Sequence, residues 1–172
     1  MRALQVQDHS QKPVFLDRSI PTLAAKQILI RTAACALNFA DLLMIRGTYQ
    51  ETPALPFTLG MEVAGEVVDL GAEVTDFQIG DRVAGFAGSG GLAEYCPIEA
   101  TRCLKLTDGM PFDTAASALI GYGTSHLALT HRAKLTSDDT LLVLGAGGGV
   151  GLTAVEIGAA LGARVIAVAR GP

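Results

Sequence analysis

The sequence predicts a mainly β domain built as a barrel, followed by the beginning of an α/β domain whose parallel sheet is incomplete. Short strand-like segments separated by turn residues fill the first 111 residues. After Pro111 the spacing of apolar residues becomes helical. From Leu141 onward a buried strand, a glycine turn, an apolar helix and a second buried strand follow one another, which is the order of a βαβ unit. These observations place the domains at residues 1–111 and 112–172.

The first domain is predicted from alternating apolar residues bounded by proline and glycine. The expected strands are Met1–Gln7, Ile28–Ala34, Val63–Leu70, Asp81–Phe86 and Leu92–Ile98. Helical spacing predicts a helix over Leu37–Gly47, with Gly47 at its end.

The second domain is predicted to begin with two helices, Phe112–Leu119 and Thr124–Ala133, which hold few β-branched residues and no proline. A turn at Asp138–Asp139 then leads into the first buried strand. The second buried strand is Arg164–Ala169, so the helix of the βαβ unit lies between residues 151 and 163.

Composition excludes several classes of protein. Apolar residues make up 49% of the chain and charged residues 17%, which leaves some apolar surface to face a partner or a further segment. A net charge of −4 without a basic cluster argues against nucleic-acid binding. Met1–Gln11 is polar and has no signal-peptide pattern, and seven glycines interrupt the apolar run Leu141–Ala169, so no membrane segment is expected.

Three cysteines, an odd number, show no C-x-x-C spacing: Cys35, Cys96 and Cys103. We interpret them as reduced thiols, which favours a cytoplasmic protein.

The glycine turn is the strongest indication of a ligand. Gly145, Gly148 and Gly151 have the pattern G-x-x-G-x-x-G between a buried strand and a helix. Glycine permits the sharp turn and lets the main chain approach a pyrophosphate, while the helix N-terminus offers N–H groups and a partial positive charge. We expect Gly151 to lie inside the helix, where the lack of a side chain permits close packing. The alternative is a glycine-rich turn that binds nothing, but the flanking strands and helix favour a dinucleotide.

The residue at the end of the second strand contacts the adenosine ribose of such a cofactor. An acidic residue there favours NAD, whereas this chain has Arg170-Gly171-Pro172, which offers a cation to a 2′-phosphate. NADPH is therefore the expected cofactor. The alternative is that Arg170 is only a solvated residue at the end of the strand.

Six segments, in their order and spacing, resemble one enzyme superfamily. They are Asn38–Asp41, Arg46–Tyr49, Leu59–Gly65, Gly80–Val83, Gly88–Tyr95 and Gly145–Gly151. On these segments the chain resembles the medium-chain dehydrogenase/reductase superfamily, in the branch of zinc-free quinone oxidoreductases related to zeta-crystallin. The resemblance covers essentially all 172 residues. It implies a GroES-like barrel carrying the catalytic cleft, followed by a Rossmann domain.

The resemblance also implies a site without metal. Zinc alcohol dehydrogenases of this superfamily have a cysteine at the position of Asn38 and a histidine at that of Met61. Amide and thioether side chains are poor zinc ligands. Hydride transfer to an electron-poor quinone or enone needs no Lewis acid, unlike alcohol oxidation.

By the same resemblance, the catalytic residues are Asn38, which lines the cleft near the nicotinamide, and Tyr49, which borders the substrate pocket. The cofactor-binding residues are Asn38, Thr124, Gly145, Gly148, Gly149, Val150, Gly151 and Arg170. Simpler roles stand beside these: Asn38 and Thr124 could each cap a helix, and Tyr49 could anchor a loop.

One feature, at position 43, limits a literal transfer of the family's chemistry. Many relatives have a tyrosine where this chain has Leu43, which favours a more apolar pocket or another donor. Asp41 and Glu62 are the carboxylates within the segments Asn38–Asp41 and Leu59–Gly65. We interpret both as hydrogen-bond acceptors at turns or helix ends rather than as acid–base catalysts, because neither has a histidine neighbour in the sequence.

Length is the largest departure, because family members continue for a comparable stretch. We expect a truncated chain that turns over NADPH poorly on its own. The leading hypothesis is an NADPH-dependent quinone oxidoreductase acting on a small molecule. The alternatives are an enoyl-thioester or enone reductase, and a non-catalytic NADPH-binding or structural protein. The resemblance makes a homodimer the candidate assembly.

Overall fold

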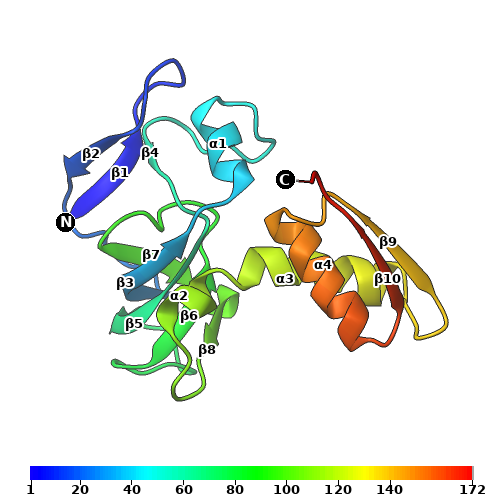
Figure 1. Cartoon of the computed structure of the whole chain (residues 1–172). Helices are drawn as coiled ribbons and strands as arrows, with labels where there is room; N and C mark the ends of the chain where they lie inside the picture. The colour runs from blue at the N-terminus through cyan, green and yellow to red at the C-terminus, as the bar shows by residue number, and fades with distance from the viewer. Residues whose placement is uncertain (172) are drawn as a thin grey trace. The chain divides into compact units, whose positions relative to one another are not determined.

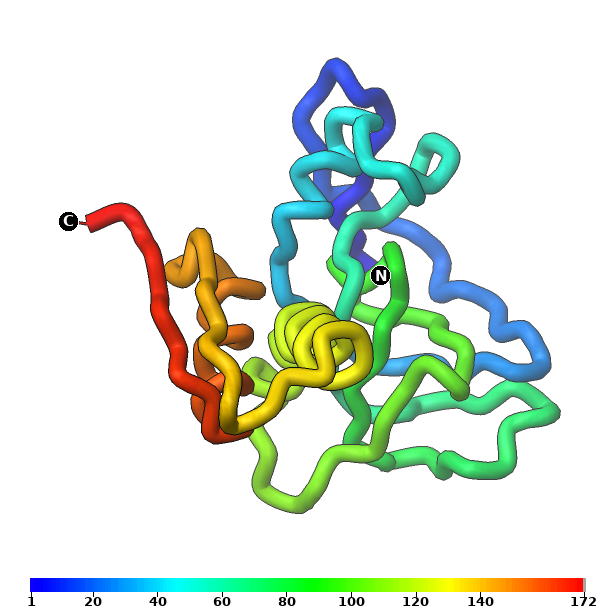
Figure 2. The backbone as a smooth tube through the Cα atoms, turned by 90° about the vertical axis from the view of Figure 1, so that its right-hand side faces the viewer, coloured from blue at the N-terminus to red at the C-terminus, as the bar shows by residue number. Residues whose placement is uncertain are grey.

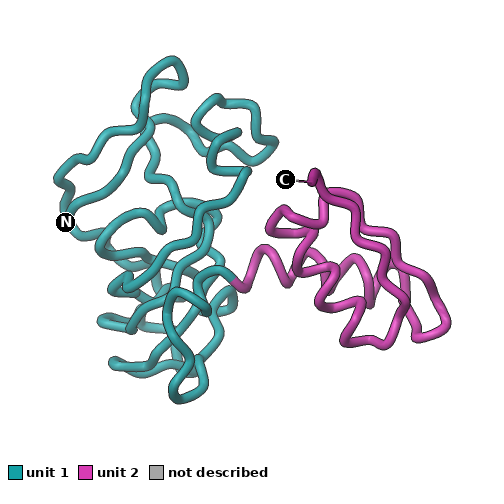
Figure 3. Tube along the Cα trace, viewed as in Figure 1, with its two compact units in different colours: residues 1–117 teal, residues 118–172 magenta. Residues whose placement is uncertain are grey.

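The computed structural model describes residues 1–171 and forms two compact units, residues 1–117 and 118–172 (Figure 3). Pro172, the last residue of the predicted second domain, lies outside the described residues. The fold class is confirmed: the first unit is built from antiparallel sheets, and the second contains the start of a parallel one. In the part of the chain that the structure describes, no helix is long and apolar enough to cross a membrane.

The first unit is organised around a five-stranded antiparallel sheet in the order β7-β3-β5-β6-β8 (Figure 1). Its strands are β3 (Gln27–Ala36), β5 (Glu62–Leu70), β6 (Arg82–Phe86), β7 (Tyr95–Glu99) and β8 (Cys103–Lys105). β3 and β5 form the longest ladder, with register shifts between Leu29 and Ile30 and between Thr32 and Ala34. Such bulges increase the local twist and let the sheet curve.

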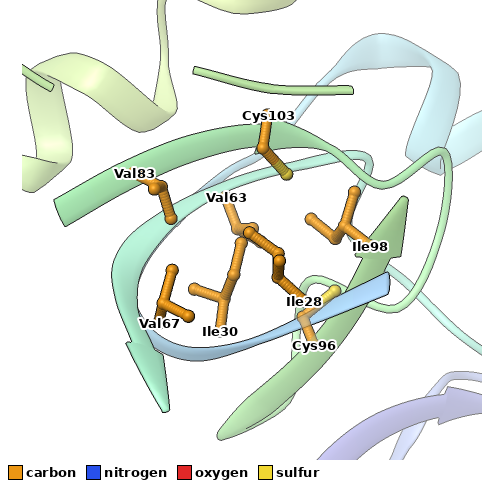
Figure 4. Packing of buried hydrophobic residues seen from close by; sticks show 8 residues of the cluster. All are labelled: Ile28, Ile30, Val63, Val67, Val83, Cys96, Ile98 and Cys103. Atoms are coloured by element: carbon orange, nitrogen blue, oxygen red, sulfur yellow. The ribbon is translucent and has the colours of Figure 1, made fainter. Parts of the chain in front are cut away.

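The core of this unit is a cluster of aliphatic side chains and thiols, all on the concave side of the curved strands (Figure 4). Its members are Ile28, Ile30, Val63, Val67, Val83, Cys96, Ile98 and Cys103. Alternate residues of β3 and β7 contribute to it, as expected for strands with one buried face.

A second, three-stranded sheet contains β2 (Val14–Asp17), β1 (Arg2–Val6) and β4 (Phe57–Thr58) in the order β2-β1-β4. A bridge between Ala3 and Ala93 connects it to the loop before β7. Of these strands only β1 was predicted. β2 has mostly exposed side chains and β4 has two residues, so neither shows a buried alternation in the sequence.

Helix α1 (Phe39–Ile45) lies within the predicted segment and ends where glycine was expected to stop it. Gly47 has a φ of +67°, and its N–H donates to the carbonyl of Met44. This is the left-handed position that closes many helices.

The helices after Pro111 differ from prediction in their bounds. α2 (Phe112–Ala116) stops before Leu119, and the Ser117 hydroxyl donates to carbonyls of Asp113 and Thr114 at its end. α2 packs against β3 and β5, so the division between the units falls after this helix, whereas the sequence analysis placed the boundary before it. The next helix begins at Leu119, earlier than the predicted Thr124.

That helix consists of α3 (Leu119–His126) and η2 (Leu127–Arg132), the latter a π-helical turn. Thr124 therefore lies inside α3, and its interpretation as a helix cap is wrong.

The second unit then forms β9 (Thr140–Leu144), α4 (Gly149–Ala160) and β10 (Arg164–Val168). β9 and β10 are parallel and run side by side over their full length (Figure 2). α4 contacts both strands and α3 on one face. The opposite face carries four exposed aliphatic side chains in register: Leu142, Leu144, Ile166 and Val168.

Candidate functional site

The glycine turn leaves the carboxyl end of β9 through a left-handed residue. Gly145 has a φ of +73°, a conformation that side chains disfavour. The Gly148 N–H donates to the Gly145 carbonyl at 3.0 Å, which closes the turn directly before α4. Gly148 is the N-cap of α4, so the helix begins one residue later.

Gly151 lies where only glycine fits. A Cβ built on it would stand 2.2 Å from the Gly145 carbonyl oxygen and 2.9 Å from the Ala146 Cα. A Cβ on Gly149 would meet no atom within 4 Å. The turn is therefore tightly packed on its inner side and open on its outer side.

The open side of the turn has the chemistry of an anion site. The N–H groups of Gly149, Val150 and Gly151 stand in the first turn of α4, where a helix supplies no acceptor and its dipole is positive. A hollow lies against them, lined by β9 residues Leu141–Leu144 and by the turn itself. These residues fit the pyrophosphate of a dinucleotide.

Arg170 follows the neighbouring strand at the same edge. The Ala146 N–H donates to the Val168 carbonyl at 2.9 Å, and a Cβ on Gly147 would lie 3.8 Å from the Ala169 Cβ. The residues that lead into Arg170 thus contact the glycine turn directly, as expected from a parallel pair of strands.

Thr124 is exposed on α3, and the residue after it is buried. The Ser125 hydroxyl lies 2.9 Å from the Val150 carbonyl oxygen and 2.8 Å from the Thr153 hydroxyl. Ser125 and Thr153 are not among the site residues expected from the sequence. The presence of a hydroxyl residue in each of two helices was the available signal, and such residues are common.

Asn38 opens α1 and is held by two carboxylates. Its backbone N–H donates to Asp41 Oδ2 at 2.7 Å, and its side-chain Nδ2 donates to Glu62 Oε1 at 2.9 Å. Asp41 Oδ1 also accepts the Gly60 N–H at 3.1 Å. Asp41 and Glu62 are 3% and 1% exposed, so both carboxylates are buried and act as hydrogen-bond acceptors.

Tyr49 is half-buried in the loop after α1, and its carbonyl accepts hydrogen bonds from the backbone and hydroxyl of Thr52. Leu43 is half-buried on α1. The predicted catalytic residues thus lie in residues 1–117, where Asn38 gathers Asp41 and Glu62 around it. The predicted cofactor residues from Thr124 onward lie in residues 118–172.

The three cysteines are free thiols in the described structure. Burial, together with the negative charges of Asp41 and Glu62, raises the pKa of Cys35 to about 12. Burial likewise raises the pKa of Cys96 and of Cys103 to about 12. Within residues 1–171, no three or more His, Cys, Asp or Glu side chains gather as a metal ion would require.

The comparisons with known proteins agree with this arrangement. Residues 24–108 match the alcohol dehydrogenase GroES-like domain. The chain is 40% identical over 163 residues to a quinone oxidoreductase-like protein 2 homolog of Nematostella vectensis, covering 92% of this chain and 45% of that protein. It is 36% identical to human quinone oxidoreductase, covering 98% of this chain and 53% of that protein.

Solved structures give the same result. A probable oxidoreductase from Mycobacterium abscessus matches with a TM-score of 0.92 and 33% identity, over 99% of this chain and 56% of that one. The quinone oxidoreductase of Thermus thermophilus, solved also as its NADPH complex, matches with a TM-score of 0.89 and 32% identity, over 100% of this chain and 54% of that one. The chain spans about half the length of the relatives it matches. By fold, by the order of its motifs and by these relatives, the chain belongs to the medium-chain dehydrogenase/reductase superfamily, among the quinone oxidoreductases and their homologues.

Proposed function

We propose that the chain is part of an NADPH-dependent quinone oxidoreductase and contributes its substrate-side domain and the phosphate-binding half of its cofactor site. The observation that carries this proposal is the glycine turn, which is closed on its inner side by Gly151 and open at the first N–H groups of α4. The NADPH complexes of related proteins support the choice of cofactor.

In this proposal the residues of the second unit bind and orient the nucleotide. The N–H groups of Gly149 and Val150 donate to the pyrophosphate, while Gly145 and Gly148 shape the turn. Arg170 pairs with the 2′-phosphate, and the Thr124 hydroxyl faces the nicotinamide ring. When bound, NADPH supplies the hydride.

The residues of the first unit prepare the acceptor side. Glu62 accepts a hydrogen bond from the Nδ2 of Asn38, which fixes the orientation of the amide as the polar group offered to the acceptor. Tyr49 borders the substrate. A quinone is already electron-poor, so orientation and exclusion of water are the main contributions required of these residues.

An enoyl reductase is the second candidate. The structure of CurK enoyl reductase matches this chain with a TM-score of 0.88 and 28% identity, over 98% of this chain and 54% of that one. Leu43 favours an apolar acceptor over one that needs a phenolic donor at that position.

The first experiment is a fluorescence titration of the purified chain with NADPH and, in parallel, with NADH. We expect saturable binding that favours NADPH. The absence of binding to either nucleotide would contradict the proposal. The rate of NADPH oxidation with a benzoquinone is then compared with the rate with a 2-enoyl thioester. The faster acceptor decides between a quinone oxidoreductase and an enoyl reductase. Binding without turnover of either acceptor supports the cofactor site alone.

Arg170→Glu tests the choice between the two nucleotides. It places a negative charge where the 2′-phosphate is expected, so the ratio of NADPH to NADH affinity should fall by at least about tenfold, which is 1.4 kcal/mol. Arg164→Glu, at the opposite end of β10, changes the net charge equally and should leave the ratio unchanged. An unaltered ratio in Arg170→Glu would remove Arg170 from the cofactor site.

A further inference from the structure

Two buried hydroxyl groups connect α3 to the first turn of α4. Ser125 is 2% exposed and Thr153 is 7% exposed, and their oxygens are 2.8 Å apart. The Ser125 hydroxyl is also 2.9 Å from the Val150 carbonyl oxygen. The Thr153 hydroxyl is 2.9 Å from the same carbonyl and 3.0 Å from the Gly121 carbonyl.

The number of protons limits how this network can be arranged. Two hydroxyl groups supply two protons, and the acceptors within reach are two carbonyls and the partner hydroxyl. One proton must lie between Ser125 and Thr153, because two oxygens 2.8 Å apart otherwise repel. If Thr153 donates to Ser125, the Ser125 hydroxyl donates its own proton to the Val150 carbonyl. If Ser125 donates to Thr153, the Thr153 hydroxyl donates its proton to the carbonyl of Gly121 or of Val150. Both hydroxyls stay satisfied in every arrangement.

Val150 lies in the part of α4 that faces the expected phosphate. Its carbonyl belongs to the first turn of the helix, directly between Gly149 and Gly151. The hydroxyl pair is therefore bonded to the backbone segment whose N–H groups form the anion site. An apolar pair would pack α3 against α4 without the cost of desolvating two hydroxyls, which is about 1–3 kcal/mol for a group left unpaired.

The pair also fixes α3 around its own axis. Ser125 is turned inward toward α4, and Thr124, the preceding residue, is exposed. Successive residues of a helix are rotated by about 100°, so an inward Ser125 keeps the Thr124 hydroxyl on a different face.

We propose that Ser125 and Thr153 are positioning residues for the nucleotide: they hold the first turn of α4 so that its N–H groups converge on the pyrophosphate. This inference rests on the proposed NADPH site and deepens it. Ser125 and Thr153 thus raise the affinity for the pyrophosphate without contacting the nucleotide themselves.

Thr153→Val is the main test. In this variant a methyl group replaces the Thr153 hydroxyl. Its carbon requires about 3.4 Å to the Ser125 oxygen, whereas the two hydroxyl oxygens lie 2.8 Å apart, so α3 and α4 must separate by several tenths of an ångström. We expect the affinity for NADPH to fall by about tenfold. The affinity for 2′-AMP, which has no pyrophosphate, should change by less than about twofold. Thr153→Ser keeps the hydroxyl and should restore NADPH affinity to within about twofold.

Thr130→Val is the matched control. The Thr130 hydroxyl donates to the His126 carbonyl, and in residues 1–171 its hydrogen bonds stay within its own helix. Its loss should leave both affinities unchanged. If Thr153→Val fails to fold, Ser125→Ala removes one proton of the network without adding volume, and the same comparison of NADPH with 2′-AMP applies.

Three results would overturn the inference: equal NADPH affinity in Thr153→Val and the unsubstituted chain, an equal loss for NADPH and 2′-AMP, or no rescue by Thr153→Ser. No NADPH binding by the unsubstituted chain contradicts the proposed function instead. Hydrogen exchange then decides the positioning role without nucleotide, because the amide of Leu152, which donates to the Gly148 carbonyl at 2.8 Å, should exchange faster in Thr153→Val and not in Thr130→Val. Unchanged exchange would also overturn it.

Discussion

Gly149 and Gly151 are two residues apart in α4, yet a side chain would meet different surroundings at each. At position 151 the nearest atom is a carbonyl oxygen at 2.2 Å, and at position 149 the space is open. Backbone atoms cannot move aside as the end of a flexible side chain can. The identity of a single residue therefore decides how closely the turn and the helix approach each other.

Gly151→Ala should open the glycine turn. We expect the free energy of unfolding to fall by about 1–3 kcal/mol, as for other overpacked sites, and NADPH affinity to fall by at least about tenfold. Gly149→Ala is the matched control and should change the free energy of unfolding by less than about 1 kcal/mol. Urea unfolding of the two variants provides the comparison, and nucleotide titration measures the affinity of Gly151→Ala. Equal behaviour of both variants would show that the close approach at Gly151 has no consequence.

The buried thiols predict a pH dependence. The pKa of Cys35, Cys96 and Cys103 is raised from 9.0 to about 12 by burial, so at pH 8 the thiolate fraction is about 10⁻⁴, against about a tenth for an ordinary thiol. Iodoacetamide should therefore modify the folded chain slowly at pH 8 and the chain in urea rapidly. Because the pKa of these thiols is raised in the folded chain, their contribution to the free energy of unfolding is fully present below pH 9. It is lost as the pH rises through 12. Rapid alkylation of the folded chain at pH 8 would contradict this.

At the scale of elements, the end of α1 combines a backbone requirement with a packing requirement. Gly47 has a φ of +67°, and a Cβ there would lie 2.9 Å from the His9 ring. The His9 Nδ1 is hydrogen-bonded to the Ile45 carbonyl at 3.1 Å, which fixes the ring against the helix end. The ring therefore has little freedom to move away from a new side chain.

Gly47→Ala should destabilise the chain more than Gly88→Ala. Gly88 has a similar φ of +74°, but a Cβ there would meet nothing within 4 Å, so its substitution costs only the backbone strain of about 1–2 kcal/mol. Gly47→Ala adds the contact with His9 to that strain. Urea unfolding measures the difference, and equal losses in the two variants would show that the ring yields freely.

The elements also show what a sequence can predict. Long strands with a buried face, such as β3 and β5, and the strand–turn–helix–strand order of residues 141–168 follow from periodicity and glycine placement. The two-residue strand β4 and the three-residue β8 do not, because recognising the alternation of a strand takes roughly four to eight residues. The helix break after Ala116 depends on a serine hydroxyl that competes for the last carbonyls, which composition does not reveal.

The candidate site was predictable to a different degree. Glycines that permit a turn have a local signal, so Gly145, Gly148 and Gly151 could be found from spacing alone. Asn38 could be found only through the family resemblance. Its contact with Glu62 joins residues 24 positions apart, and the Ser125–Thr153 contact spans 28, so both depend on tertiary packing.

At the scale of the whole molecule, the two units differ in how much they bury. The first unit contains the eight-residue core cluster within a five-stranded sheet. In residues 118–171, the buried apolar side chains are Leu129, Val143, Ala146 and Ala163, and the sheet has two strands. A sheet of two strands gains little stability by itself.

Hydrogen exchange should therefore separate the two units. We expect the backbone amides of β9 and β10 to exchange at least about a hundredfold faster than those of β3 and β5, because local opening costs less where few apolar groups are buried. Mass spectrometry of exchanged peptides resolves both regions in one experiment. Equal protection of the two sheets would show that they unfold as one cooperative unit.

Asp41 joins two segments that are distant in sequence, since its two oxygens accept the N–H of Asn38 and the N–H of Gly60. A mutagenesis library of this segment should keep this carboxylate, because a change there displaces the start of α1 and the entry to β5 together. Leu37, Phe39 and Leu42 lie on the same segment but are 74%, 72% and 51% exposed. Substitutions at these three positions remove few buried contacts, so they should leave the arrangement that Asp41 holds together intact.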